Sequence, residues 1–179
     1  MKLNSRPTIY WSLLSFKDWK FYIAATEKGL AFVGSLNKPF EELSTWVEKY
    51  FLGSPLIEDA KKLQPYINEM IEFLDGKRKT FTVPFDYSGT DFQLAVWNAL
   101  CQIPYGQTKS YSDIATYINK PNAVRAVGTA IGANPILITV PCHRVIGKNG
   151  AITGYRGGVK MKKQLLELES HVLRSRTFH

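Results

Sequence analysis

The sequence is poor in the residues that hold small or metal-dependent folds together. It contains two cysteines, Cys101 and Cys142, and three histidines, His143, His171 and His179. Two cysteines cannot form a framework of several disulfides, and they are too few for a zinc site with the usual ligand spacing. We therefore expect no disulfide scaffold, no metal and no cofactor.

Long apolar runs are also missing. None reaches the roughly 20 residues that a membrane-spanning helix requires, and residues 1–8 (MKLNSRPT) lack the apolar core of a signal peptide. Hydrophobic residues make up 45% and charged residues 21% of the 179 residues, which is typical of a soluble globular protein. We expect no membrane partner and a cytoplasmic location, or a nuclear one if the source is a eukaryote.

Acidic residues are absent from a long stretch of the second half. Residues 114–166 contain no Asp or Glu but eight basic side chains. These are Lys120, Arg125, Arg144, Lys148, Arg156, Lys160, Lys162 and Lys163. The net charge of the chain is +8, so the rest of the chain is neutral. A solvated basic face is one interpretation, and a site for a polyanion, most often nucleic acid, is the other.

The first half predicts a small sheet and two helices. Three runs of aromatic and β-branched residues, separated by turns, indicate an antiparallel sheet. The runs are residues 9–16, 19–26 and 29–35. Apolar residues at helical spacing follow in 39–51 and 59–75, and Gly76 ends the second helix. Residues 81–86 (FTVPFD) indicate one further extended piece.

Two short helices are predicted in the second half. The first covers 110–118 and begins at a serine cap, and the second covers 123–134 and is rich in Ala and Gly. A turn at 119–122 joins them, which gives the outline of a helix-turn-helix. Many such helix pairs bind nothing, but this one lies in the acid-free basic stretch, which favours DNA.

Other elements are expected around this helix pair. A helix over 92–103 carries Cys101, which we expect to be a core thiol. Residues 136–140 (ILITV) predict a buried strand. A closing helix covers residues 159–169.

Cys142 and His143 are adjacent in the motif PCHR. The thiolate is the nucleophilic form of cysteine, and a histidine whose ring reaches the sulfur, directly or through water, can remove the thiol proton. A carboxylate on the far ring nitrogen would fix the tautomer of the histidine, and the candidates are Asp113, Glu167, Glu169 or an acid further upstream. An inert, buried cysteine is the alternative.

Seven short motifs follow one another between residues 90 and 170. They are IPYGQT (103–108), SY (110–111), RAVGTA (125–130), NP (134–135), PCHRV (141–145), GYRGG (154–158) and LLELE (165–169). Together they resemble the methylated-DNA–protein-cysteine methyltransferases, also called O6-alkylguanine-DNA alkyltransferases. The first 85 residues match that family only in general layout.

The resemblance implies an α+β fold in two parts. Residues 1–87 would form a small N-terminal α/β domain on an antiparallel, ribonuclease H-like sheet. Residues 88–179 would form a winged-helix-like domain with the helix-turn-helix, and this domain would bind DNA and carry the alkyl acceptor.

The resemblance also implies catalytic roles. Cys142 would accept the alkyl group, His143 would act as base through water, and Glu169 would orient the histidine. Asn134 would tether the helix pair to the cysteine segment, and Tyr111 would protonate the guanine ring as it leaves. We expect His143 and Glu169 to keep the thiol ionised by lowering its pKa.

Further residues would contact DNA and the damaged base. Arg125 would enter the duplex as a wedge where the base has left. Other expected DNA contacts are Tyr111, Lys120, Ala123, Ala126, Thr129 and Arg144. The base pocket would be lined by Tyr155 and by the backbone of Val145 and Arg156. Arg156 stands where the family often has a small residue, so its cation is expected to narrow the pocket mouth or to contact a phosphate, unless only its backbone takes part.

The implied function is direct reversal of DNA damage. The protein would flip O6-alkylguanine, and also O4-alkylthymine, out of double-stranded DNA and transfer the alkyl group irreversibly to its own cysteine, once per molecule and as a monomer. Other functions stay open from the residues: a winged-helix DNA-binding regulator, a lesion-recognition protein without transfer, and a cysteine hydrolase.

Overall fold

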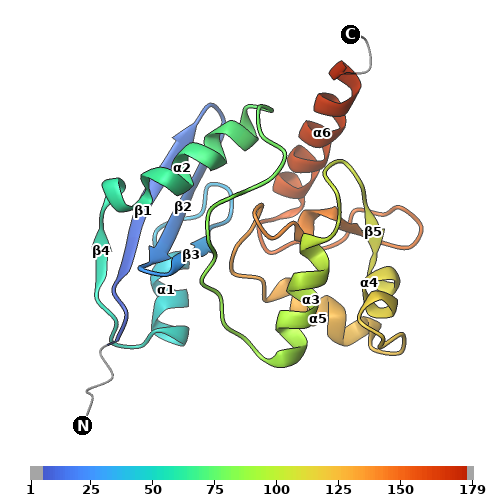
Figure 1. Ribbon diagram of the computed structural model, residues 1–179, viewed down its shortest axis with the longest axis horizontal. Coiled ribbons are helices and arrows are strands. Elements are labelled where there is room, and N and C mark those ends of the chain that lie inside the picture. Colours follow the sequence, from blue (N-terminus) through green and yellow to red (C-terminus); the bar gives the residue numbers. More distant parts are fainter. Residues whose placement is uncertain (1–5, 177–179) are drawn as a thin grey trace.

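The computed structural model describes residues 6–176, and its N-terminal half is built on a four-stranded sheet (Figure 1). Strands β1 (Ile9–Phe16), β2 (Trp19–Thr26) and β3 (Gly29–Val33) are antiparallel, as predicted. Strand β4 (Leu56–Glu58) pairs parallel with β1, so the strand order is β3-β2-β1-β4. Its three residues are too few for a period-two pattern, so the sequence did not predict this strand.

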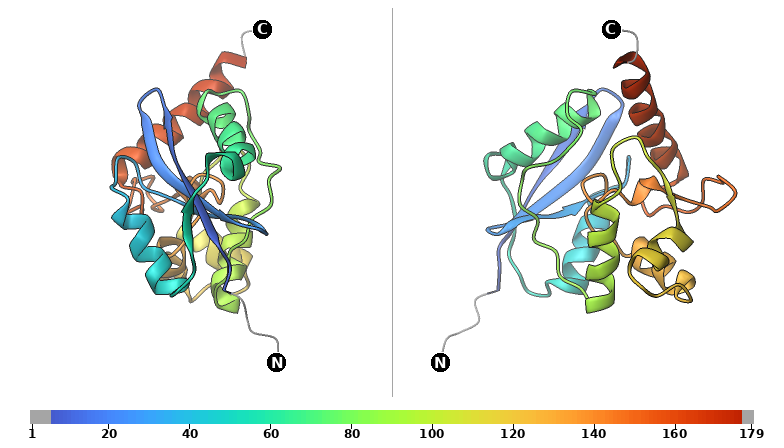
Figure 2. Two further views of the ribbon diagram at one scale, coloured as in Figure 1. Left: turned by 90° about the vertical axis from the view of Figure 1, so that its left-hand side faces the viewer. Right: turned by 45° about the vertical axis from the view of Figure 1, so that its right-hand side comes forward.

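Helices α1 (Glu41–Tyr50) and α2 (Ala60–Leu74) cover opposite faces of this sheet (Figure 2). Side chains alternate between the two faces along each strand, so one strand supplies both packing surfaces. Helix α1 packs Leu43 into a small cluster with Phe32, whereas α2 packs Leu63 into the main core. Both helices agree with the predicted ranges.

Helices dominate the second half. They are α3 (Asp91–Cys101), α4 (Tyr111–Tyr117), α5 (Val124–Gly132) and α6 (Val159–Arg176). Helices α3 and α4 begin with capping boxes, in which Thr90 pairs with Gln93 and Ser110 with Asp113. Helices α4 and α5 pack together, with residues 118–123 between them, so the predicted helix pair is present.

The predicted strand over 136–140 does not form. The segment is buried throughout, but within it only Ile136 is bridged to a strand residue, Val33, and Ile138 has a left-handed φ of 70°. An apolar run of this length is compatible with burial in several conformations, so its composition did not distinguish a strand from an irregular segment.

The cysteine motif follows this segment as a helical turn and a short strand. The 3-10 turn η1 covers Cys142–Arg144, and strand β6 covers Val145–Ile146. Strand β6 pairs parallel with β5 (Lys109–Ser110), which directly precedes α4. This pairing brings the first turn of α4 next to the cysteine motif.

One hydrophobic core runs through both halves of the chain. Buried side chains of the sheet and α2 form a continuous cluster with those of α3, α5 and residues 136–140. The predicted domain boundary, after residue 87, falls in the extended stretch between α2 and α3. Cys101 was expected in this core but is exposed, because it is the last residue of α3 and the buried stripe there runs through Leu100.

Candidate active site

A pocket between α4, α5 and the loop before α6 has Cys142 in its wall. The other lining residues are Tyr111, Gly128, Ile131, Gly132, Gly154, Tyr155 and Arg156. Glycine at three of these positions leaves the pocket without side chains there. Cys142 is 2% exposed, so its sulfur is accessible only to a group that enters the pocket.

Asn134, two residues after the C-terminal end of α5, holds the cysteine segment. Its Nδ2 donates to the backbone O of Val140 at 3.0 Å and to Sγ of Cys142 at 3.2 Å. Its Oδ1 accepts from the backbone N of Ile136 at 3.0 Å. The buried amide therefore joins the end of α5 to the segment that carries the thiol, which is the contact that the tether role requires.

The pKa of Cys142 is raised, because the sulfur is buried. The hydrogen bond from Asn134 and the cations of Arg156 and Lys162 act in the opposite direction but do not outweigh burial. The expectation that His143 and its carboxylate partner keep the thiol ionised is therefore wrong. Desolvation favours the neutral thiol, so its proton must leave during the reaction.

His143 is fully buried beside Glu169 of α6. Its Nε2 lies 2.5 Å from Oε2 of Glu169. Burial lowers the pKa of His143 despite this partner, so the ring is neutral at pH 7. The carboxylate accepts a hydrogen bond from Nε2–H, so the proton of the neutral ring is on Nε2 and Nδ1 is the acceptor. Nδ1 is buried and has no hydrogen-bond partner among residues 6–176.

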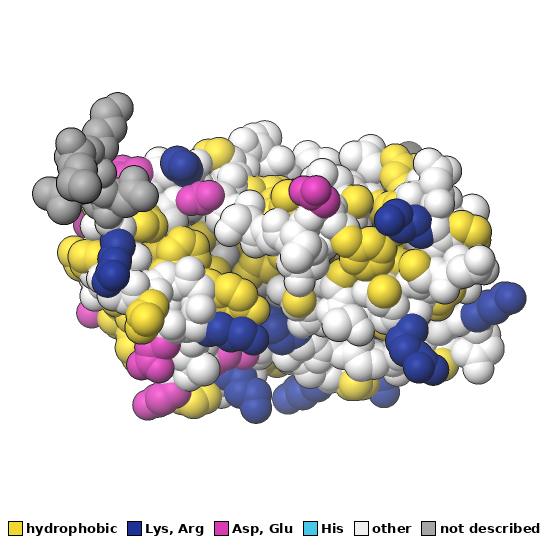
Figure 3. Space-filling model, turned by 90° about the horizontal axis from the view of Figure 1, so that it is seen from below, with side chains coloured by type: hydrophobic (Ala, Val, Ile, Leu, Met, Phe, Trp, Pro, Cys, Tyr) yellow, Lys and Arg dark blue, Asp and Glu magenta, His cyan; other side chains and the backbone are white. Residues whose placement is uncertain are grey.

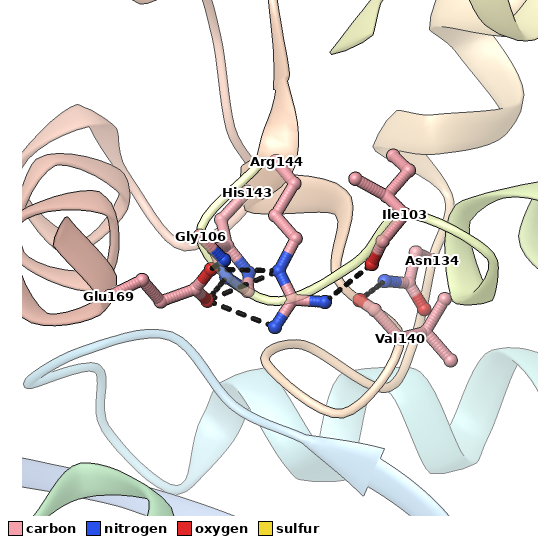
Figure 4. Close-up of polar contacts among 7 residues, drawn as sticks. All are labelled: Ile103, Gly106, Asn134, Val140, His143, Arg144 and Glu169. Carbon is pink, nitrogen blue, oxygen red and sulfur yellow. Dashed lines mark hydrogen bonds and ion pairs between the residues drawn. The ribbon is translucent and has the colours of Figure 1, made fainter. Parts of the chain in front are cut away.

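Arg144 is buried rather than presented to DNA (Figure 4). Its Nε donates to Oε1 of Glu169 at 2.9 Å, and its Nη1 donates to the backbone O of Ile103 at 2.8 Å. The backbone N of Gly106 donates to the same carboxylate at 2.8 Å. The prediction that Arg144 contacts DNA is therefore wrong. Its charge compensates the buried carboxylate of Glu169, and this pairing makes the burial of both groups possible.

These donors keep Glu169 ionised. Burial alone would raise its pKa, but the hydrogen bonds from His143 and Arg144 hold the pKa below its usual range. Glu167, the other candidate in the LLELE motif, is exposed. The contact of the histidine with Glu169 thus agrees with the prediction.

Tyr155 lines the pocket, as predicted, and so does Tyr111, which was expected to act on the leaving base. The hydroxyl of Tyr111, at the start of α4, lies 2.7 Å from Oγ1 of Thr153. The pKa of Tyr155 is raised well above its usual value, because its hydroxyl is buried. Val145 does not line this pocket, because its side chain belongs to the main core and its backbone pairs with β5.

The outer face of α5 is exposed and carries small and basic side chains. Arg125, Ala126 and Thr129 are exposed and Ala123 is half-buried. Their spacing puts them on one side of the helix, next to the exposed Lys120. In the view of Figure 3, the side of the molecule that carries α4 and α5 presents Lys and Arg without Asp or Glu. Small side chains around the one cation of this helix, Arg125, allow a close approach of a phosphate backbone.

The basic stretch is divided between surface and interior. Its exposed members are Lys120, Arg125, Lys148, Lys160 and Lys163. Arg144 and Lys162 are buried and Arg156 is half-buried, so these three belong neither to a solvated basic face nor to a surface that could meet a polyanion. Each of the three hydrogen-bonds to carbonyl oxygens inside the protein.

Arg156 does not narrow the pocket mouth or reach towards DNA. Its guanidinium points to the N-terminal half, where Nη2 donates to the backbone O of Val33 at 2.6 Å. Lys162, which the sequence reasoning missed as a site residue, donates through Nζ to the backbone O of Thr153 at 3.3 Å and lies close enough to Cys142 to oppose the rise of its pKa. The helical spacing of Lys162 with the inward-facing Glu169 was a signal that could have located it.

The described part of the chain contains no cluster of three or more His, Cys, Asp or Glu side chains that could bind a metal ion. Within residues 6–176, no helix is both long and apolar enough to span a bilayer.

Two family models match the chain. The model described as "6-O-methylguanine DNA methyltransferase, ribonuclease-like domain" matches residues 9–87, and the model for the DNA binding domain of the same methyltransferase matches residues 91–171. Together they cover most of the chain, including every motif quoted above.

Individual proteins are similar over nearly their whole length. The inducible methylated-DNA–protein-cysteine methyltransferase of Bacillus subtilis (strain 168) is 72% identical over 166 residues, which is 93% of each chain. The methyltransferase of the same name from Methanosarcina barkeri is 41% identical over 170 residues, covering 93% of this chain and all of that one. The crystal structure of Mycobacterium tuberculosis O6-methylguanine methyltransferase has a TM-score of 0.79 at 37% identity and covers 92% of this chain and 94% of that one.

A solved complex is similar as well. The structure of Mycobacterium tuberculosis OGT in complex with DNA has a TM-score of 0.79 at 36% identity, covering 91% of this chain and 94% of that one.

Proposed function

Since the chain belongs to the 6-O-methylguanine DNA methyltransferase family, we propose that it repairs DNA by transferring the alkyl group of O6-alkylguanine to its own Cys142. One observation carries the assignment of the acceptor. Cys142 is in the wall of a pocket beside α5, and two exposed cations, Arg125 on α5 and Lys120 in the turn before it, are available to a phosphate backbone. Cys101, by contrast, is outside that pocket.

The reaction begins with the removal of the thiol proton. Neutral His143 has Nδ1 free to accept it through a water molecule, while Glu169 stabilises the imidazolium that forms. Asn134 donates a hydrogen bond to the sulfur, and this bond is stronger to a thiolate than to a thiol. The thiolate is therefore generated inside the pocket, where only a bound alkyl group meets it.

The sulfur then attacks the alkyl carbon. A carbon–sulfur bond forms as the bond between that carbon and O6 breaks, and the electron pair moves into the guanine ring. Tyr111 donates a proton to the leaving base and regains one from His143 through solvent, so that the proton of the thiol ends on guanine. The product is a thioether, and none of the described residues is positioned as a nucleophile to cleave it. Each molecule therefore acts once.

The alkyl carbon is inaccessible inside the base stack, so the damaged nucleotide must rotate out of the duplex. Arg125 is the exposed long side chain on the outer face of α5, and we assign to it the role of filling the gap. Lys120, Ala123, Ala126 and Thr129 are assigned to the same interface. We propose that the protein acts as a monomer, in the cytoplasm or in a eukaryotic nucleus, and that O4-alkylthymine is a second substrate.

The test is the mass of the intact protein after incubation with an excess of a duplex containing one O6-methylguanine. We expect an increase of one CH₂ group, located on the peptide that contains Cys142, and no increase with the unmodified duplex. The same experiment with O4-methylthymine tests the second substrate. Binding without a change of mass would indicate a regulator or a lesion-recognition protein, and product beyond one equivalent would indicate a hydrolase.

A further inference from the structure

Arg156 connects the wall of the pocket with the N-terminal half. Its Nε donates to the backbone O of Asn134 at 3.0 Å. Its Nη2 donates to the backbone O of Val33 at 2.6 Å and of Pro135 at 3.1 Å. The planar fork of a guanidinium suits several acceptors held at fixed positions, and lysine cannot reproduce it. One side chain thus joins the end of β3 to the turn that follows α5.

The backbone of Arg156 is held from the same side. Its carbonyl O lies 3.2 Å from Oγ of Ser35, and Ser35 also contacts the carboxylate of Glu42 through its hydroxyl and through its backbone N, the latter at 2.7 Å. Oε2 of Glu42 in turn lies 3.7 Å from Nη1 of Arg156. The guanidinium also lies over the ring of Phe32, 5.1 Å from its centroid. Residues 32–42 therefore contact both the guanidinium and the backbone carbonyl of Arg156.

These contacts bear directly on the pocket. Arg156 directly follows Gly154 and Tyr155, which line the pocket. Residues 154–157 are also tightly packed against one another, because a Cβ on Gly157 would come within 2.7 Å of the Tyr155 ring. In addition, Arg156 binds the backbone of Asn134, whose side chain donates to Cys142. A shift of Arg156 would therefore move the pocket wall relative to the sulfur.

We propose that Arg156 is a positioning residue that fixes the pocket wall against the N-terminal half and thereby limits the size of the alkyl group that Cys142 accepts. This inference rests on the proposed transfer to Cys142. It gives the N-terminal half a part in substrate selection, although its own residues do not line the pocket. The guanidinium is already engaged by three carbonyl oxygens, so a role as phosphate contact is not part of the proposal.

The experiment compares two rate constants in each variant: methyl transfer from a duplex containing O6-methylguanine, and benzyl transfer from the same duplex containing O6-benzylguanine at the same position. In Arg156→Ala the wall is no longer held, so methyl transfer should slow by about 10–100-fold, the cost of a misplacement near 1 Å. Benzyl transfer should slow less, because a wall that can move admits the larger group, so the ratio of benzyl to methyl rates should rise, by at most the factor by which methyl transfer slows. Arg156→Lys keeps the charge but loses the fork, and should resemble Arg156→Ala.

The matched control is Lys38→Ala, which removes an exposed cation from the same part of the N-terminal half and should leave both rates unchanged. A general loss of folded protein, or the loss of a cation near the sulfur, would slow both reactions equally and leave the ratio unaltered. If Arg156→Ala does not fold, Glu42→Gln weakens the same contacts more mildly and should raise the ratio by a smaller factor.

The outcomes separate the two proposals. An unchanged ratio in a folded, active Arg156→Ala or Glu42→Gln variant, or an Arg156→Lys variant that behaves like the unaltered protein, would overturn the positioning role. If the unaltered protein accepts neither alkyl group, the proposed function fails instead.

Discussion

The amide nitrogen of Asn134 lies 3.2 Å from the sulfur of Cys142, and the same nitrogen donates to the backbone O of Val140. This buried contact stabilises the thiolate, whereas burial of the sulfur destabilises it, and burial is the larger effect. The balance between these two effects determines the pH at which Cys142 reacts.

We predict that the pH–rate profile of Cys142 has its midpoint above the usual thiol pKa of about 8.5. A raised pKa means that the thiolate, and with it the rate, declines as the pH falls through a higher value than for a free thiol. Asn134→Ala should shift the midpoint further upwards, because it removes a group that lowers the pKa. The measurement is the rate of alkylation by iodoacetamide in a Cys101→Ser background. A midpoint at or below 8.5, or one that Asn134→Ala leaves in place, would contradict this account.

The acceptor itself is tested by stoichiometry. Cys142→Ala should abolish methyl transfer and leave the affinity for duplex DNA nearly unchanged, because the exposed cations lie elsewhere. Cys101→Ala is the matched control and should still take up one methyl group per molecule. Titration with radiolabelled methylated DNA measures both properties. A parallel loss of DNA affinity in Cys142→Ala would mean that the fold, and not the nucleophile, had been damaged.

Glu169 is predicted to contribute strongly to stability. Glu169→Gln removes the charge that compensates Arg144, so the free energy of unfolding should fall by about 3–5 kcal/mol. Glu167→Gln alters an exposed position on the same helix and should change it by less than about 0.5 kcal/mol. Urea denaturation at pH 7 measures both.

The pH dependence of this contribution has a definite sign. The pKa of Glu169 is lowered in the folded state, so its contribution is present above the unfolded pKa of about 4.3 and is lost as the pH falls through the folded value. The stability difference between the unaltered protein and Glu169→Gln should therefore shrink below about pH 4. A difference that persisted undiminished at lower pH would assign the effect to packing instead.

Arg125→Ala should slow the repair of duplex DNA by a larger factor than the reaction with free O6-benzylguanine. The free base needs no rotation out of a stack, so a residue that fills the gap in the duplex has no part in its reaction. Single-turnover kinetics with the two substrates give the comparison. Equal slowing of both would remove Arg125 from base flipping and would assign it to the pocket or to the fold.

Salt dependence separates cations that contact DNA phosphates from exposed cations elsewhere on the surface. Lys120→Ala should reduce the slope of log K against log salt concentration by about 0.9, the value for one phosphate contact with duplex DNA. Lys38→Ala, at an exposed position of the N-terminal half, should leave the slope unchanged. Fluorescence anisotropy with an unmodified duplex at several salt concentrations measures the slopes, and equal slopes for Lys120→Ala and the unaltered protein would exclude the contact.

The sequence predicted the chemistry of the site better than its electrostatics. The adjacency of Cys142 and His143 is visible in the sequence, but Glu169 lies 26 residues from its histidine. The residues alone left Asp113, Glu167, Glu169 or an acid further upstream as candidates, and the resemblance of the LLELE motif to the family pointed to Glu169, which the fold brings to His143. The structure gives the reason: Glu169 belongs to the inward face of α6, while Glu167 is exposed.

Burial of cations could not be read from composition. From the sequence, Arg144 and Arg156 were expected at the surface, because arginine is seldom buried unless it is paired. Their partners are supplied by segments distant in the chain: Glu169 lies 25 residues from Arg144, and Val33 lies 123 residues from Arg156. The first pairing depends on the packing of α6 against the cysteine turn, and the second on the packing of the two halves; local patterns encode neither.

The backbone at Ile138 restricts how the protein could be made more heat-resistant. A β-branched residue at φ 70° stores about 1–3 kcal/mol of strain, which glycine would relieve. Glycine would also empty a fully packed site, and removing a large aliphatic side chain costs about 2–5 kcal/mol. The cost of the emptied site exceeds the relief of strain. A library of variants at position 138 selected for thermal tolerance should therefore favour isoleucine over glycine. Replacing Ile138 with glycine therefore cannot stabilise the segment that leads into the cysteine turn.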